Sequence, residues 1–259
     1  MCGIFGFALK TPIAMDNVFR LLEKLEVHQY PSEPKPVGGY GAGIAVLEES
    51  GEVLCEKIGS VDGSPAKRLS EIFSVKEASI LIAHVRMPSP QFMTSSSFKE
   101  TAQPYIAKCQ PDLTVISVHN GYIENYKEIK GKLCGKHVFE SEKSGFIDSE
   151  IIPHFFEEKL LEKGDVNDAL DAVFSNMEGS SAIGILQIST KGTFLHFIHK
   201  GNKTRGLTVW TNKYSEAIFC SRKEVLVGDF NKMLVQGEFE EKVSVQWRED
   251  ASLKLSVTI

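Results

Sequence analysis

Residues 1–10 read MCGIFGFALK, with a cysteine directly after the first methionine and an apolar run behind it. Ile4, Phe5 and Phe7 are typical of a buried β-strand, because apolar side chains recur over a short stretch without a charge. A strand explains these three residues but gives no reason for a thiol at position 2. If the methionine is removed, Cys2 carries a nucleophilic thiol and a free α-amine that can act as its base. The alternative is a chance cysteine at the start of a buried strand.

The composition indicates a globular chain. It has 259 residues, 42% hydrophobic and 24% charged, which allows a sizeable core. A formal net charge of -5 gives no basic footprint for nucleic acid or for an anionic membrane. No stretch approaches the roughly 20 apolar residues that cross a bilayer, and the N-terminus does not resemble a signal peptide. We therefore expect a cytoplasmic protein that binds neither nucleic acid nor membrane.

The cysteines and histidines are scattered. The five cysteines are Cys2, Cys55, Cys109, Cys134 and Cys220, and no two of them form a CxxC pair. Such a set is typical of reduced thiols, and we expect Cys55, Cys109 and Cys220 to be small buried hydrophobic residues. The seven histidines show neither HExxH nor clustered Cys/His spacing. The sequence therefore predicts no metal site and no cofactor.

Helical and strand patterns occupy different parts of the chain. Helical spacing predicts helices over residues 13–29, 66–73, 123–133, 148–163 and 166–177, with Gly179 as the C-cap of the last. β-Rich runs predict a hairpin over residues 42–59 and strands over 78–86, 113–119, 182–188, 193–199, 207–211, 217–221 and 233–239. Strands at both ends with helices between them predict sheets covered by helices, an α+β layered architecture.

No linker divides the chain, so we expect a single domain over residues 1–259. Residues 242–259 alternate apolar and polar side chains on both sides of Glu249-Asp250. That pattern predicts a C-terminal β-hairpin extension.

Two charged residues are candidates for ligand binding. Arg86 lies where a predicted strand passes into the proline-rich end of HVRMPSP, residues 84–90. There its guanidinium can grip a carboxylate with two hydrogen bonds, although an ordinary surface ion pair is the alternative. Asp148, in GFIDSE at residues 145–150, precedes a predicted helix. It either caps that helix or offers a carboxylate to an ammonium group.

Asn120 and Gly121 lie in SVHNGYIEN, residues 117–125. A strand is predicted to stop there, because glycine can adopt a positive φ. The Asn120 amide and the Gly121 N–H would then lie side by side as two donors that can stabilise an oxyanion. The alternative is a simple Asn-Gly turn, although a helix follows where a hairpin would need a second strand.

These elements, in this order, resemble the glutaminase domain of class II glutamine amidotransferases, the N-terminal nucleophile family that includes glucosamine-6-phosphate synthase and glutamate synthase. The resemblance covers roughly residues 2–240, and the segments that carry it are CGIFGF, HVRMPSP, AQPY, SVHNGYIEN, IDSEII and EAIFCSRKEVL. It implies a four-layer αββα fold, in which two stacked, mainly antiparallel sheets lie between helical layers.

The resemblance also implies residue roles. Cys2 would attack the side-chain amide of glutamine to give a γ-glutamyl thioester, glutamate and ammonia, with its own α-amine as base. Asn120 and the Gly121 N–H would hold the oxyanion. Arg86 would bind the α-carboxylate of glutamine, and Asp148 its α-ammonium.

The chain departs from the sugar-phosphate synthases of this family at HVRMPS, where they have HTRWAT. Met87 replaces the tryptophan, and Ser89 can stand for the threonine as a hydroxyl contact; we expect both residues to bind substrate. No segment that resembles an isomerase or synthetase domain follows. We therefore expect a free-standing enzyme with an ammonia-accepting synthase subunit as partner, and homo-oligomer formation stays open.

Two other functions stay open. The chain could be an N-terminal nucleophile hydrolase of another γ-glutamyl compound or amide, since Arg86 and Asp148 would fit any γ-glutamyl head group. It could also be a non-catalytic glutamine-sensing subunit, but the presence of both Cys2 and Asn120 disfavours that reading.

Overall fold

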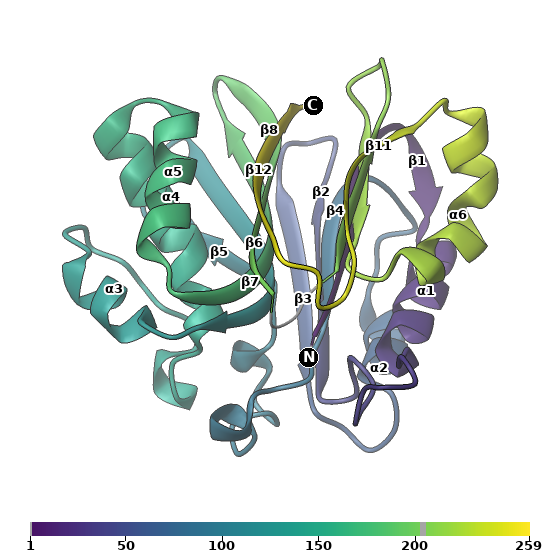
Figure 1. Cartoon of the computed structure of the whole chain (residues 1–259), viewed down its shortest axis with the longest axis horizontal. Helices are drawn as coiled ribbons and strands as arrows, with labels where there is room; N and C mark the ends of the chain where they lie inside the picture. The colour runs from purple at the N-terminus through teal and green to yellow at the C-terminus, as the bar shows by residue number, and fades with distance from the viewer. Residues whose placement is uncertain (1, 203–205) are drawn as a thin grey trace.

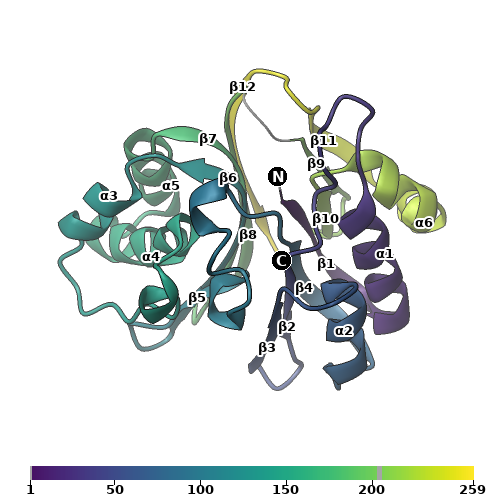
Figure 2. The same ribbon diagram turned by 90° about the horizontal axis from the view of Figure 1, so that it is seen from below.

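Two antiparallel β-sheets pack face to face, and helices cover the outer face of each sheet (Figures 1 and 2). The computed structural model describes residues 2–202 and 206–259. The order of layers is helices, sheet, sheet, helices, which confirms the predicted α+β architecture and its αββα form. The expected removal of the first methionine concerns a residue outside the described ranges.

The first sheet has seven strands in the order β11-β9-β10-β1-β4-β2-β3. Its strands are β1 (Gly3–Ala14), β2 (Gly41–Leu47), β3 (Val53–Gly59), β4 (Glu77–Val85), β9 (Leu207–Thr211), β10 (Ala217–Cys220) and β11 (Glu240–Val245). The helices on its outer face are α1 (Met15–Val27), α2 (Pro65–Ile72) and α6 (Lys223–Gln236). β1 therefore lies inside the sheet, between β4 and β10, where both of its edges are paired.

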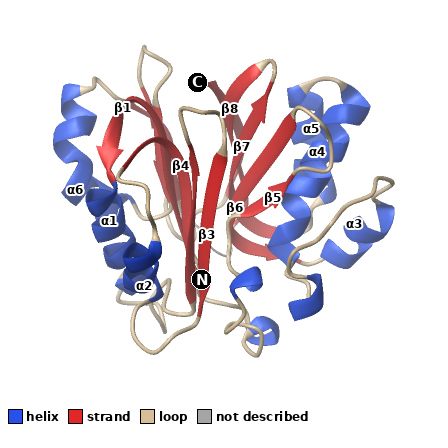
Figure 3. Cartoon of the chain, turned by 180° about the vertical axis from the view of Figure 1, so that it is seen from behind, coloured by secondary structure: helices blue, strands red, loops and turns tan. Residues whose placement is uncertain are grey.

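The second sheet has five strands in the order β12-β8-β7-β6-β5. Its strands are β5 (Tyr105–Ala107), β6 (Leu113–Ile123), β7 (Gly179–Ser189), β8 (Gly192–Gly201) and β12 (Ala251–Thr258). The helices on its outer face are α3 (Tyr126–Lys132), α4 (Ile151–Lys163) and α5 (Val166–Asn176), as Figure 3 shows from behind. Short 3-10 helices lie at Pro90–Phe92, Lys99–Thr101, Glu142–Ser144 and Asp148–Glu150.

The apolar run after Cys2 is continuous because both faces of β1 are buried. Phe5 and Phe7 pack on the helical side of the sheet, whereas Ile4 packs between the two sheets. Successive side chains of a strand point to opposite faces, so a strand in the middle of this sandwich needs apolar residues at every position. The continuous apolar pattern of residues 4–7 thus results from the position of β1 inside the fold.

The C-terminal part differs from the sequence prediction in two places. Residues 233–239 do not form a strand, since α6 runs to Gln236. Leu226, Phe230 and Leu234 recur every fourth residue and are buried on one side of this helix, in the core beneath it. Nor do residues 242–259 form a hairpin, because β11 pairs with β9 in one sheet and β12 pairs with β8 in the other.

Two glycines also differ from expectation. β6 does not stop at Asn120-Gly121 but continues to Ile123, and Gly121 pairs with Ser181 of β7. Gly121 is not among the residues with a positive φ. Gly179 is not the C-cap of α5, which is Met177; it begins β7 with a φ of 106°.

No helix in the described ranges is both long and apolar enough to cross a membrane.

Candidate active site

Cys2 precedes β1 at the boundary between the two sheets. Its backbone N–H donates to Asn120 Oδ1 at 3.2 Å, and Asn120 belongs to β6 of the opposite sheet. Its Sγ lies 3.4 Å from Met87 N, which donates to the sulfur, and 3.5 Å from Met87 O. Met87 follows β4, the neighbour of β1. The half-buried thiol is therefore held by backbone groups of Met87, whereas the Cys2 N–H contacts a side chain of the other sheet.

Asn120 and Gly121 lie in a regular strand, at an edge of β6 that is open to other partners. The N–H groups of His119 and Ile123 donate to side chains there, to Gln103 Oε1 at 2.6 Å and to Asp148 Oδ2 at 2.9 Å. Because N–H directions alternate along a strand, the Gly121 N–H points to this same edge. The Gly121 N–H therefore takes this direction without the predicted positive φ.

Arg86 is not a surface residue. Its side chain is buried beside β4, where Nη1 donates to Thr101 Oγ1. Nη2 is also buried, and it has no hydrogen-bond partner among the described residues. Burial lowers the pKa of Arg86, whereas nearby Tyr105, Cys2 and Asp148 favour its charged form. An arginine keeps its charge under such conditions, so this guanidinium has a donor that suits an anionic group of a ligand.

Asp148 is buried and does not cap the helix that follows it. Its Oδ2 accepts the Ile123 N–H at 2.9 Å, whereas α4 begins at Ile151 without a side-chain cap. Burial raises the pKa of Asp148 to about 6, against the opposing effects of backbone N–H groups and of the charge on Arg86. The structure thus places a carboxylate and a guanidinium within electrostatic range of each other and of the edge of β6.

Met87 and Ser89 have different positions relative to the thiol. Met87 contacts Cys2 through its backbone N and O. Ser89 is half-buried and precedes the short helix Pro90–Phe92, where its carbonyl accepts the Phe92 N–H at 2.9 Å. Among the described residues, no hydrogen bond links the Ser89 hydroxyl to Cys2 or Arg86. The structure brings Met87 to the nucleophile and leaves Ser89 without such a contact.

Three residues that support the site are absent from the predicted set. Thr101 accepts the hydrogen bond of Arg86, and Ser221 Oγ accepts the Ile4 N–H at 3.0 Å. Gln103 binds both backbone groups of His119, through Oε1 at 2.6 Å and Nε2 at 3.0 Å. Gln103 and Ser221 lie in segments that carry the family resemblance, so a signal was present for them. Thr101 lies in an irregular polar loop that shows no pattern.

Comparison with known proteins shows which protein family the chain matches. Residues 93–227 match the glutamine amidotransferase domain family, and the match covers just over half of the chain. The chain belongs to this family.

Curated relatives of this glutamine amidotransferase domain include two enzymes named glutamine–fructose-6-phosphate aminotransferase [isomerizing]. The enzyme from Thermosynechococcus vestitus is 32% identical over 191 residues, which are 72% of this chain and 26% of that protein. The enzyme from Thermotoga maritima is 32% identical over 202 residues, which are 75% of this chain and 28% of that protein. The domain thus spans about a quarter of the length of these relatives.

Two solved structures share the fold. The allosteric regulatory enzyme of purine biosynthesis superposes with a TM-score of 0.64 at 18% identity, over 95% of this chain and 45% of that chain. Glutamine phosphoribosylpyrophosphate amidotransferase from B. subtilis superposes with a TM-score of 0.60, also at 18% identity, with the same coverage. Both agree with the predicted αββα fold.

Proposed function

We propose that this domain hydrolyses glutamine with Cys2 as nucleophile and releases ammonia for transfer to an acceptor. The observation that carries the proposal is the meeting of the two sheets at Cys2. Its N–H is 3.2 Å from Asn120 Oδ1, and its Sγ is 3.4 Å from Met87 N. A nucleophile and an amide donor thus border the same space from opposite sheets.

Arg86 and Asp148 would bind the two charged groups of the substrate, its α-carboxylate and its α-ammonium. The unpartnered Nη2 of Arg86 suits the α-carboxylate of glutamine, and the buried carboxyl of Asp148 suits its α-ammonium. Burial strengthens both ion pairs once the substrate has displaced water. Bound between them, glutamine would have its neutral side-chain amide free to reach Cys2.

The reaction would start when the α-amine of Cys2, exposed by removal of the first methionine, takes the thiol proton. Sγ then attacks the side-chain carbonyl carbon, and the carbonyl oxygen becomes an oxyanion. Asn120 accepts from Cys2 N through Oδ1, which leaves its Nδ2 as a donor to that oxygen, beside the Gly121 N–H. Collapse to the thioester expels ammonia with the proton from the amine. Water then releases glutamate and regenerates the thiol.

The ammonia acceptor is assigned to another protein unit. The matched relatives are about four times as long as the matching region, so most of their length has no counterpart within residues 1–259. We take the described chain as one glutaminase domain and a synthase subunit as its partner. Met87 would hold the thiol, and the half-buried Ser89 would offer its hydroxyl to substrate.

The test is the release of glutamate and ammonia from glutamine by the purified chain, together with its intact mass. Cys2→Ala is expected to abolish both products, since the remaining groups supply no nucleophile. Cys134→Ala is the matched control, because Cys134 is an exposed thiol whose Sγ lies 3.6 Å from the carbonyl oxygen of Lys132. The mass of the active protein should lack the first methionine, and a glutamine-like electrophile should add to the wild type and to Cys134→Ala but not to Cys2→Ala.

Other outcomes would contradict the proposal in distinguishable ways. Full activity in Cys2→Ala would exclude this nucleophile. Faster turnover of γ-glutamyl peptides than of glutamine would assign the chain to another γ-glutamyl hydrolase. Tight glutamine binding without turnover, in a protein that has lost its first methionine, would make it a sensor.

A further inference from the structure

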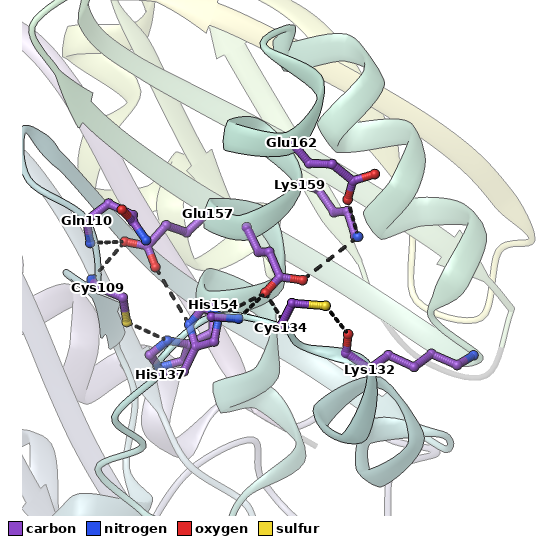
Figure 4. Close-up of polar contacts among 11 residues, drawn as sticks. Cys109, Gln110, Lys132, Cys134, His137, His154, Glu157, Lys159 and Glu162 are labelled. Carbon is purple, nitrogen blue, oxygen red and sulfur yellow. Dashed lines mark hydrogen bonds and ion pairs between the residues drawn. The ribbon is translucent and has the colours of Figure 1, made fainter.

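Four side chains with metal-binding chemistry meet on the helical side of the second sheet, away from Cys2. Cys109 follows β5, His137 lies in the segment after α3, and His154 and Glu157 are one turn apart on α4. Figure 4 shows these side chains pointing toward one another. One ligand atom from each lies within 4.8 Å of all the others. They are far apart in the sequence, so linear spacing alone could not predict the cluster.

Three buried polar atoms in this cluster have no hydrogen-bond partner in the described part of the chain. They are His137 Nδ1, His154 Nε2 and Glu157 Oε2. The side chains of His137 and Glu157 are 4% and 0% exposed, and His154 is 1% exposed. Leaving a buried polar atom unpaired costs about 1–3 kcal/mol, so His137 Nδ1 and Glu157 Oε2, which lie 3.8 Å apart, call for a ligand that satisfies both.

The other atoms of two of these side chains are anchored. His137 Nε2 lies 3.2 Å from Glu158 Oε2, which leaves Nδ1 directed at the cluster. Glu157 Oε1 accepts the backbone N–H of Cys109 at 2.9 Å and that of Gln110 at 3.3 Å, which leaves Oε2. A histidine that binds a metal through one ring nitrogen usually hydrogen-bonds through the other, often to a carboxylate, as His137 does to Glu158. The anchoring therefore prepares both side chains to bind one ion.

The distances suit a tetrahedral ion. Zinc bonds of about 2.0–2.3 Å give ligand-to-ligand distances of about 3.3–3.8 Å. Cys109 Sγ lies 3.4 Å from His154 Nδ1, and His137 Nδ1 lies 3.8 Å from Glu157 Oε2. These two edges of the tetrahedron are already formed. The remaining separations need to shorten by about 1.5 Å at most to complete it.

We infer that Cys109, His137, His154 and Glu157 bind one Zn²⁺ ion. A thiolate, two imidazoles and a carboxylate are ligands that zinc prefers, whereas Ca²⁺ and Mg²⁺ select oxygen alone. The thiolate and the carboxylate together balance the charge of the dication, so the occupied site is neutral in its buried position. The thiol proton passes to solvent as the S–Zn bond forms.

The site is structural. All four positions are filled by protein side chains, which leaves no open position for a substrate or a catalytic water. The ion joins α4 to two connecting segments, one before β6 and one after α3. Asp148 lies at the end of the second segment, directly before α4.

The test uses the full chain, treated with a chelator and then titrated with Co²⁺ and with Zn²⁺. We expect one Co²⁺ per chain, a thiolate-to-cobalt charge-transfer band in the near ultraviolet, and loss of that band when one equivalent of Zn²⁺ is added. Cys109→Ser should remove the band and weaken Zn²⁺ binding by about 100-fold or more. Cys134→Ser, in the nearby exposed thiol, should leave the band and the affinity unchanged.

Glu157→Gln keeps the acceptor for the N–H of Cys109, so it should fold even if the cysteine variant does not. It should retain the cobalt–thiolate band but bind Zn²⁺ at least about 10-fold more weakly. A wild-type chain that binds no Co²⁺ would overturn the inference. So would a band that persists in Cys109→Ser, or one that disappears in Cys134→Ser. Metal content is measured separately from glutaminase activity, so failure here would leave the proposed function standing.

Discussion

Asp148 is the residue at which stability and proposed function conflict most clearly. Its carboxyl is buried and its pKa is raised to about 6, chiefly because burial disfavours the charged form. The positive charge of Arg86 and the N–H of Ile123 offset only part of that cost. A bound ammonium group would supply the missing counter-charge. In the absence of substrate, the charged form of Asp148 is therefore less favourable in the folded domain than in the unfolded chain.

Asp148→Asn is therefore expected to make the chain more stable at neutral pH. Between the ordinary carboxyl pKa of 3.8 and the folded value of about 6, the folded chain binds more protons than the unfolded chain. Stability is then lost as pH rises through this window, and the loss persists above it. The asparagine variant should match the wild type near pH 4 and exceed it by up to about 3 kcal/mol at pH 8.

Urea unfolding at both pH values measures this difference. In the same variant, the KM for glutamine should rise by about 30-fold or more, because the ammonium group loses its ionic partner. Asp168→Asn, in the first turn of α5, is the control for a general effect of charge and should change neither quantity. A variant that is less stable than the wild type at pH 8 would contradict the account of Asp148.

Single residues could be predicted where their chemistry has few other uses. A cysteine at position 2 and an arginine at a strand end suggested a nucleophile and an anion binder before any fold was known, and the resemblance ordered them. Asp148 was harder, because a carboxyl before a helix is more often a cap. Thr101 and the cluster around Cys109 gave no local signal, since their partners come together only through the fold.

Among the secondary-structure elements, β6 packs closely against its neighbours at the site. A Cβ at Gly121 would lie 2.3 Å from His119 Nε2 and 2.4 Å from Ser180 O. His119 is itself held by Ser149 and Ser181 at 2.8 and 3.0 Å, so its ring cannot move away freely. Glycine is needed here for space rather than for a positive φ, and the continuous strand is the reason.

Gly121→Ala is expected to destabilise the fold by about 1–3 kcal/mol, because β6 must shift away from His119 or β7. The shift moves Asn120 relative to Cys2, so kcat should fall more than KM rises. Gly131→Ala is the matched control: a Cβ there meets nothing within 4 Å, and α3 should become more stable by about 0.5–1 kcal/mol. Equal unfolding midpoints for the two variants would contradict the packing argument.

At the scale of helices and strands, the sequence predicted which elements form better than it predicted where they end or which strands pair. β1, β4 and the β2–β3 hairpin follow from apolar runs and turn residues. The whole of α6 was missed: no helix was predicted over residues 223–232, and residues 233–239 are as apolar as a short strand. Only the recurrence of apolar residues at every fourth position from Leu226 to Leu234 identifies the helix. The pairing of β11 and β12 with different sheets depends on contacts that no local pattern encodes.

The whole molecule places the site where its two sheets meet. Cys2 and Arg86 come from the first sheet, and Asn120 and Gly121 come from the second. Apolar packing between the sheets sets their separation, with Phe219 of β10 and Phe197 of β8 as an edge-to-face pair at 5.1 Å. We therefore expect side chains of this apolar layer to control the distance between Cys2 and the proposed oxyanion donors, Asn120 and Gly121.

Phe219→Leu and Phe156→Leu separate this effect from general destabilisation. Both side chains are fully buried, but Phe219 packs between the sheets and Phe156 packs beneath the helices of the second sheet. Each substitution should cost about 1–3 kcal/mol in unfolding free energy. Only Phe219→Leu should lower kcat as well, since only it lets the sheets move relative to each other. Equal kcat in both variants would show that the separation of the sheets is set elsewhere.

During protein synthesis, β1 is made long before its partner β10, so the pairing of these two strands is delayed. Phe5 pairs with Cys220, so an edge of the strand behind Cys2 stays open until the ribosome has delivered the far end of the domain. At about 5–20 residues per second, that interval is roughly 10–40 s. During this interval the apolar strand is accessible to chaperones. An enzyme that removes the first methionine, and so exposes the amine of Cys2, can act while the chain is still extended. Slower translation before residue 220 would lengthen the interval, whereas refolding of a finished chain would not include it.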